Sequence, residues 1–433
     1  MTAVAEHLPG EPVVAPGRPA RALMVRSAQL LVLALAATVA GPLYLGSLLV
    51  WDRPPIVVRA RQVARYLRLV WTVHPDPDLT GFARVWLTGA IARVALAAPL
   101  WGLAWQLDEL LYGRALGDVR IEGPLFEISA ARSGSTQLAR YLEDDPHLAA
   151  PSFLQAVLPF RWMWRLAPVT AGRWLTADGV RRWIEATLPP EFVERHEGDP
   201  FRTDTFDVAL YTAHLNHLAP NLGPDVLADE FGFASDSPHV RGLWEHDFVA
   251  LVDRVARKTL LHAGPGPDGR PRRFFLKGHF LNAADALARR YPDARFLTMI
   301  REPAARLRSA ANYLRANPFE APLGPPAWAW FGEGLARSET TYCERELAWF
   351  TAPEGPRRTV LRFEAYVADL EGSLGRVYAE CLDTPALPPH APRAHPPRRR
   401  AGYRLDRTLA QLGVDEQVFT ARLAPYLAWC REP

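Results

Sequence analysis

The sequence predicts an α/β fold with a central, mainly parallel sheet flanked by helices. Three segments carry this prediction, each with a short apolar run before a polar loop and a helix; they begin at Leu125, Phe274 and Arg295. Apolar runs of about four to six residues that end in turn residues are typical of buried strands. Strands that alternate with helices form βαβ units, whose strands are parallel.

The first segment, Pro124–Leu142, has the character of an anion site. The run Leu125–Ile128 predicts a strand, and the small residues around Gly134 turn directly into a helix that carries Leu138. The first amides of a helix lack internal partners and the helix dipole is positive there, so a glycine beside them lets a phosphate approach the backbone closely. The loop is not a Walker loop, because it has neither the Gly-Lys pair nor the spacing of that motif.

The segment Arg295–Arg315 places a cation at the end of another strand. It predicts a strand, then Arg301, then a helix that opens with Pro303 and carries Ser309. Ligands of open α/β sheets bind outside the carboxyl ends of the strands. Arg301 is therefore a candidate binding residue.

Two further strands complete the predicted sheet. Phe274–Leu276 predicts a buried strand that runs into Lys277, Gly278 and His279. Thr359–Glu364 resembles the strand before the helix that closes the core, here Leu370–Leu382, in the family to which these motifs are compared.

Together these motifs resemble those of the PAPS-dependent sulfotransferases of bacterial type, which use 3′-phosphoadenosine 5′-phosphosulfate (PAPS) and have a P-loop-like fold. Arg132–Thr136 is similar to their 5′-phosphosulfate loop, in which a basic residue is followed by Ser, Gly, Ser or Thr, and Thr. Arg301 and Ser309, eight residues apart, resemble the pair that holds the 3′-phosphate. Lys277 and His279 resemble the Lys and His that bracket the transferring sulfuryl group.

The resemblance implies an enzyme that moves the sulfuryl group from PAPS to a hydroxyl or amine acceptor without a metal ion. Lys277 would neutralise charge on the leaving oxygen, and His279 would accept the proton of the acceptor. The residues that would hold PAPS are Arg132, Ser133, Gly134, Ser135, Thr136, Gln137, Arg301 and Ser309, with Arg399 and Arg400 in a basic loop over the nucleotide.

The chain departs from the family pattern in two places. Arg132 stands where cytosolic members have lysine, which keeps a cation in the loop. Gly278 stands where they have a hydroxylated residue, and this leaves the pose of His279 open. A carboxylate from the region that matches no motif, of which Glu230 is one choice, is the alternative base.

Composition adds little about the reaction but excludes some classes of protein. The net charge is +3, and dispersed arginines without stacking aromatic residues do not indicate a nucleic-acid module. The three cysteines are scattered, which favours a reducing compartment. His214 and His217 have no third metal ligand nearby in the sequence, which argues against a metal site there. The chain has only two lysines, Lys258 and Lys277, and the second of them lies in the candidate site.

The amino-terminal part predicts attachment to a membrane. No charged residue occurs from Ser27 to Trp51, 25 positions, and a spanning helix needs roughly 20 apolar residues. Val85–Leu107 predicts a second apolar helix, for which a second span with one charge, a re-entrant or surface-lying helix and a core helix all remain open. The favoured position is on the membrane surface or packed on the catalytic domain. The predicted organisation is a disordered tail (1–25), a transmembrane helix (26–52), juxtamembrane amphipathic and apolar helices (53–118) and a sulfotransferase domain (119–433) with a helical insertion (150–270).

The arginines that flank the span, three before it and five after it, favour a cytoplasmic catalytic domain at a bacterial inner membrane. An active site near a bilayer favours a lipidic or lipid-linked acceptor. Two alternatives remain open at this point. One is a nucleotide-dependent kinase or other phosphate-binding transferase, and the other is an inactive membrane scaffold with the same fold.

Overall fold

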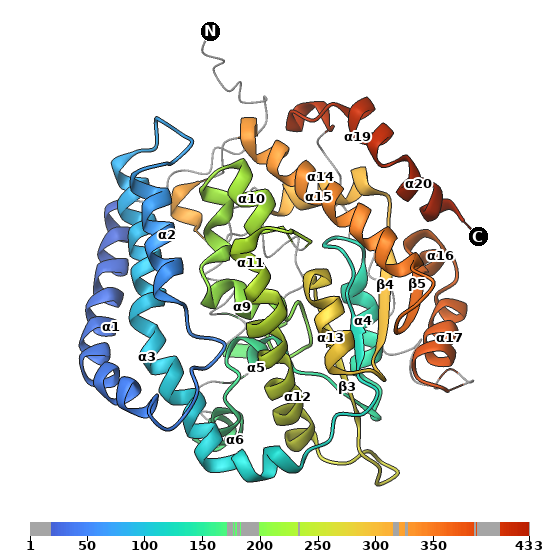
Figure 1. Cartoon of the computed structure of the whole chain (residues 1–433), viewed down its shortest axis with the longest axis horizontal. Helices are drawn as coiled ribbons and strands as arrows, with labels where there is room; N and C mark the ends of the chain where they lie inside the picture. The colour runs from blue at the N-terminus through green and yellow to red at the C-terminus, as the bar shows by residue number, and fades with distance from the viewer. Residues whose placement is uncertain are drawn as a thin grey trace.

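Five parallel strands form the centre of the molecule. The computed structural model describes residues 19–432, except 171–175, 177, 180–181, 183–198, 233, 315–319, 325–327, 385–386 and 388–407. The strand order is β2-β3-β1-β4-β5, and every neighbouring pair is parallel (Figure 1). Their bounds are β1 Leu125–Glu127, β2 Leu148–Ala149, β3 Arg273–Lys277, β4 Arg295–Ile300 and β5 Arg357–Arg362. The predicted parallel sheet is thus confirmed, and the two-residue edge strand β2 was not predicted.

Successive side chains of the strands point to opposite faces of the sheet, and helices cover both faces. Leu125 and Leu297 pack in one cluster with α4 and α17, whereas Phe126 and Phe296 pack in the main core, which also holds residues of α12, α13, α14 and α15. The helices that follow the amino-terminal layer are α4 Ser135–Glu143, α13 Ala284–Arg290, α14 Pro303–Leu314, α15 Trp328–Thr351, α16 Phe363–Ala368, α17 Leu370–Cys381, α19 Glu416–Arg422 and α20 Ala424–Arg431, with 3₁₀ turns η3 Leu281–Ala283, η4 Ala321–Leu323 and η5 Ala410–Leu412.

The position of β1 in the sheet determines where a ligand can bind. From β1 the chain moves to β2 on one side of the sheet, and from β4 it moves to β5 on the other side. β1 and β4 are neighbours in the sheet, so the loops that follow them lead away in opposite directions. Such a switch point opens a crevice at the carboxyl ends of the strands.

The segment between β2 and β3 is mainly helical in its described residues, as the sequence predicts. Its elements are α5 Phe153–Val157, α6 Arg161–Thr170, α9 Asp207–Ala213, the 3₁₀ helix η1 Asn216–Asn221, α10 Pro224–Glu230, α11 Pro238–Gly242, the π-helix η2 Leu243–Phe248 and α12 Val249–Ala263.

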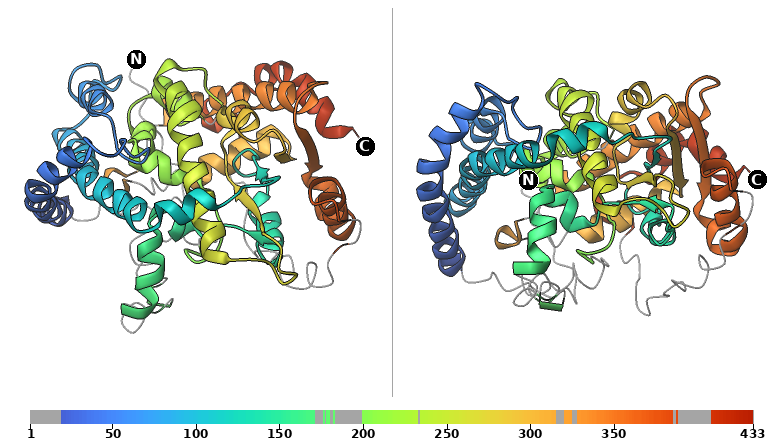
Figure 2. Two further views of the ribbon diagram at one scale, coloured as in Figure 1. Left: turned by 60° about the horizontal axis from the view of Figure 1, so that its bottom comes forward. Right: turned by 90° about the horizontal axis from the view of Figure 1, so that it is seen from below.

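The three amino-terminal helices form a layer at one edge of the molecule (Figures 1 and 2). They are α1 Pro19–Ser47, α2 Ala60–Trp71 and α3 Gly81–Asp118. Among the described residues, α1 and α3 are the helices with the length and apolar composition that crossing a membrane requires. Near its carboxyl end α3 is held to the domain by a buried ion pair between Asp108 and Lys258, 2.9 Å apart.

Candidate functional site

The loop between β1 and α4 has the curled backbone that an anion site requires. Arg132 and Gly134 both have positive φ, 68° and 95°, and they flank the buried Ser133. Gly134 is the N-cap of α4, so the first amides of the helix face the loop. A Cβ atom on Gly134 would lie 2.7 Å from Cε2 of Phe363, which explains why a glycine is needed.

Replacing Gly134 with alanine should lower the free energy of unfolding by about 1–3 kcal/mol, because it combines a left-handed backbone with the clash against Phe363. Gly413 is a matched control, since its φ is +71° and no atom lies within 4 Å of the position that a Cβ would take. Gly413→Ala should therefore lose only the backbone part. Urea denaturation measures both, and equal losses would contradict the close packing of the loop on Phe363.

The hydroxyl of Ser133 supports a ligand at this loop. Its Oγ is buried and has no hydrogen-bond partner among the described residues. Buried polar groups are normally hydrogen-bonded, and an exception calls for a bound water, ion or ligand. The chemistry of the surrounding donors, which are amides, hydroxyls and a guanidinium, suits an anion.

Three residues predicted to bind the two phosphates of one nucleotide lie together. Nε of Arg132 donates to Oγ of Ser309 at 2.9 Å, and Nη1 of Arg301 donates to the carbonyl oxygen of Arg132 at 3.0 Å. Ser309 is buried on α14, and Arg301 follows β4 directly. The loops after β1 and β4 thus meet at the switch point of the sheet.

Two aromatic side chains that the sequence interpretation missed support this cluster. The guanidinium carbon of Arg301 lies 4.2 Å from the ring centroid of Phe363, and that of Arg132 lies 5.5 Å from the ring of Tyr313. Both contacts hold a guanidinium against an aromatic ring and so orient it beside the loop. Neither residue is one of the motif positions, so only their places could have indicated a role: Tyr313 follows Ser309 on α14, and Phe363 directly follows β5.

Lys277 reaches the same loop from the end of β3. Its ammonium lies 3.3 Å from Oγ1 of the partly buried Thr136, and 2.9 Å from Oγ1 of Thr205 and 3.2 Å from Oδ1 of Asp204, both of which are buried. Glu127 is paired in register with Lys277, and burial raises the pKa of its carboxyl to about 7 although the lysine opposes the shift. Lys277 therefore links the loop between β1 and α4 to the helical insertion.

His279 is oriented by a carboxylate of the insertion. The amide of His279 donates to Oδ1 of Asp207 at 2.6 Å, and its Nδ1 lies 3.7 Å from Oδ2. Burial lowers the pKa of the imidazole, and Asp207 only partly offsets this effect. The geometry also explains the departure at Gly278, because a Cβ there would lie 2.4 Å from Oδ1 of Asp207. The glycine makes room for the carboxylate that holds the histidine.

The remaining predicted residues have different positions. Gln137 lies in the first turn of α4 and its side chain hydrogen-bonds Tyr141. Glu230, the alternative base, is buried between Arg65 and the hydroxyl of Tyr66 on α2, so its carboxylate serves the packing of that helix. The predicted contributions of Arg399 and Arg400 lie outside the described residues.

The buried histidines of the insertion predict loss of stability in acid. Burial lowers the pKa of His214 to about 4, while its Nε2 donates to the carbonyl oxygen of Pro55 at 2.7 Å. The unfolded chain takes up this proton near pH 6.5, so the free energy of unfolding should fall by about 1.4 kcal/mol per pH unit between about pH 6 and 4. His214→Gln should reduce this slope in urea titrations, and the exposed His239→Gln should not. An unchanged slope in His214→Gln would contradict the burial of a neutral imidazole.

No group of metal ligands occurs in the part of the chain that the structure describes.

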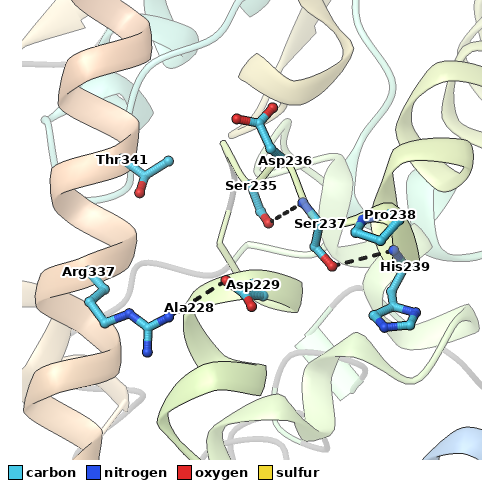
Figure 3. A pocket seen from close by; sticks show the side chains of 9 residues that line it. All are labelled: Ala228, Asp229, Ser235, Asp236, Ser237, Pro238, His239, Arg337 and Thr341. Carbon is cyan, nitrogen blue, oxygen red and sulfur yellow. Dashed lines mark hydrogen bonds and ion pairs between the residues drawn. The ribbon is translucent and has the colours of Figure 1, made fainter.

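A polar cleft on the surface lies apart from these residues (Figure 3). Its lining comes from α10, α11 and α15 and includes Asp229, Ser237, His239 and Arg337. None of its lining residues is a predicted site residue. The candidate site is therefore identified by the meeting of the three motifs and not by this cleft.

Comparison with known proteins bears on the family and the fold. The model of the sulfotransferase family matches residues 124–384. The fold is similar to the crystal structures of sulfotransferase STF9 from Mycobacterium avium (TM-score 0.58, 18% identity, 86% of this chain and 92% of that one) and sulfotransferase STF1 from Mycobacterium tuberculosis H37Rv (TM-score 0.51, 17% identity, 89% and 98%). A search of curated protein sequences finds no match. The predicted sulfotransferase fold is confirmed.

Proposed function

Because the chain belongs to the sulfotransferase family, we propose that it transfers the sulfuryl group of PAPS to a hydroxyl or amine acceptor. The observation that carries the proposal is the cluster of Arg132, Arg301 and Ser309. These side chains offer charge-assisted donors at two places beside the same loop, which suits a nucleotide with separate 5′- and 3′-phosphate groups. ATP has no 3′-phosphate, so this arrangement favours PAPS over a kinase substrate.

In the proposed complex, the loop holds the 5′-phosphosulfate of the donor. The amides from Ser133 to Thr136 and the positive end of the α4 dipole would bind its oxygens, and the buried hydroxyl of Ser133 would gain its missing partner. Arg301 and Ser309 would bind the 3′-phosphate. Lys277 would exchange part of its contact with Asp204 for the oxygen that bridges phosphorus and sulfur.

The transfer then requires that the charge on the leaving oxygen is neutralised and that the acceptor loses a proton. The acceptor oxygen or nitrogen forms a bond to sulfur while the bond from sulfur to the bridging oxygen breaks, and adenosine 3′,5′-bisphosphate leaves. Lys277 neutralises the charge that develops on the bridging oxygen. His279, neutral because burial lowers its pKa, takes the acceptor proton, and Asp207 stabilises the imidazolium that results.

We further propose a lipidic or lipid-linked acceptor and a catalytic domain on the cytoplasmic side of a bacterial inner membrane. Support comes from one stretch of chain that joins the site to the amino-terminal helices. Phe206 donates its amide to the carbonyl oxygen of Lys277, and a few residues later Leu215 and Leu218 pack on α2 and α3. An acceptor beside α9 would thus lie close to the apolar layer.

Radiolabelled donors test the proposal. Detergent-extracted enzyme should move ³⁵S from labelled PAPS into an acceptor of a bacterial lipid extract and should move no ³²P from γ-labelled ATP. Phosphate transfer from ATP would favour the kinase alternative, and no transfer from either donor would favour the inactive scaffold. Transfer of ³⁵S to soluble small molecules, with lipids ignored, would leave the reaction standing and overturn the lipidic acceptor.

A further inference from the structure

Helix α1 leaves a continuous apolar stripe uncovered. Large side chains on one face are more than half exposed, including Leu31 (63%), Leu35 (62%) and Val39 (67%). Ten of the twenty exposed large hydrophobic side chains in the described residues lie between positions 24 and 50. The opposite face, with Arg26 and Tyr44, rests on α3. In all three views α1 is the outermost element at its edge of the molecule (Figures 1 and 2).

The direction of the helices limits how this layer can meet a membrane. Arg26 lies against Gly89, Tyr44 lies against Gly102, and Oγ of Ser47 donates to Oε1 of Gln106 at 2.6 Å. Position numbers rise together along both helices, so α1 and α3 are parallel. Two consecutive parallel spans require the segment between them to cross the bilayer as well.

That connecting segment cannot cross. Its helix α2 has 12 residues, about 18 Å at 1.5 Å per residue, whereas the hydrocarbon core is about 30 Å thick. It also carries Arg61, Arg65 and Arg68, and charges at that depth are costly. The rest of the connection is largely irregular backbone, which lipid does not tolerate. α1 and α3 therefore do not both span.

The attachment of α3 to the domain excludes a single span by α1 in this fold. At one end of α3, Nε1 of Trp86 donates to Oε2 of Glu320 at 2.5 Å, and Arg26 of α1 pairs with the same carboxylate at 3.0 Å. At the other end Asp108 pairs with Lys258. Because α1 lies alongside α3 between these points, a spanning α1 would draw these buried charges of the domain into the hydrocarbon.

We propose that α1 lies in the plane of one leaflet of an anionic bilayer, with the stripe from Met24 to Leu49 in the acyl boundary and α3 between it and the catalytic domain. This attachment replaces the transmembrane helix that the sequence predicts. A helix that is apolar on all sides is stable when lipid covers the face that protein does not. The occupant is an anionic leaflet because exposed arginines flank the stripe along the chain, Arg21 before it and Arg61 after it.

Labelling from one side distinguishes a helix in the plane from a spanning helix. Ala20→Cys and Asp52→Cys place thiols at exposed positions in the first turn of α1 and after its end, in a Cys430→Ser background in which the other cysteines, Cys343 and Cys381, are buried. The full-length protein is bound to preformed sealed vesicles of phosphatidylcholine and phosphatidylglycerol. A membrane-impermeant maleimide added outside should label both positions to the same extent. Labelling of only one position until detergent is added would overturn the proposal.

Vesicle flotation tests the stripe itself. The double variant Leu35→Glu and Val39→Glu should lower the partition coefficient onto the same vesicles at least about tenfold, because two apolar contacts with the leaflet are lost. Val418→Glu, at an equally exposed position (65%) on α19, should leave it unchanged. Unaltered flotation of the double variant would contradict the proposal. So would sedimentation without lipid that shows a wild-type dimer and a monomeric double variant, since a second copy would then cover the stripe.

Discussion

Replacing Lys277 with methionine should lower the turnover number about 10²–10³-fold, the usual effect of removing one donor that stabilises transition-state charge. Methionine is similar in length to lysine but carries no charge, so it cannot neutralise the charge on the bridging oxygen. Affinity for adenosine 3′,5′-bisphosphate should change far less, because in the proposed complex the two phosphates are bound by Arg132, Arg301, Ser309 and the loop amides. Single-turnover assays with labelled PAPS and calorimetry of product binding separate the two quantities.

The control for this prediction comes from the partner of the lysine. Lys277→Met leaves Asp204 buried without its cation, which by itself destabilises proteins by about 3–5 kcal/mol. The double variant Lys277→Met with Asp204→Asn removes both charges and should recover most of the stability but none of the activity. Recovery of turnover in the double variant would show that Lys277 has a structural role only.

Replacing His279 with glutamine should lower turnover about 10²–10⁴-fold, the range typical of a lost general base. In the wild-type enzyme the rate should fall as pH drops below the lowered pKa of the imidazole, because the protonated ring cannot accept a proton. This acidic limb should disappear in His279→Gln. A pH–rate profile of single-turnover transfer measures it.

Two further variants test whether the effect is specific to His279. Asp207→Asn should lower turnover less than His279→Gln and should move the acidic limb to lower pH, because the carboxylate that favours the imidazolium is gone. His147→Gln, at a side chain that is 58% exposed, should leave turnover and the profile unchanged. A His279→Gln enzyme with full activity and an unchanged acidic limb would exclude His279 and make Asp204 the next candidate.

The parts of the fold that depend on local pattern were predictable from the sequence. β1, β3 and β4 follow from short apolar runs, β5 follows from the family resemblance, and the helix α14 follows from the proline at its first turn and its apolar face. The loop residues Arg132–Thr136 lie in one short segment of the sequence, and so do Arg301 and Ser309, so both patterns can be recognised without the fold. A βαβ pattern implies parallel strands and so places both loops at the same edge of the sheet, whereas the neighbourhood of β1 and β4 is known only from the structure.

Contacts between distant segments were not predictable in this way. Asp204 and Asp207 lie in a region without a family motif, and only the fold brings them to Lys277 and His279, more than 70 positions away. The departure at Gly278 left the histidine pose open until the carboxylate beside it was seen. Glu230 was a wrong choice of alternative base, because its carboxylate is buried against α2. Nothing in the sequence around Glu230 indicates this contact. The parallel course of α1 and α3 depends on packing between helices that look alike in composition.

The direct measurement of the central claim is the affinity of the protein for adenosine 3′,5′-bisphosphate relative to 5′-AMP. Calorimetry should show at least about tenfold tighter binding of the bisphosphate, since one charge-assisted hydrogen bond contributes about 1.5–3 kcal/mol. The preference should vanish in the double variant Arg301→Met with Ser309→Ala, in which 5′-AMP affinity stays near the wild-type value. Equal affinities of the wild-type protein for the two nucleotides would contradict a 3′-phosphate pocket at the ends of β1 and β4.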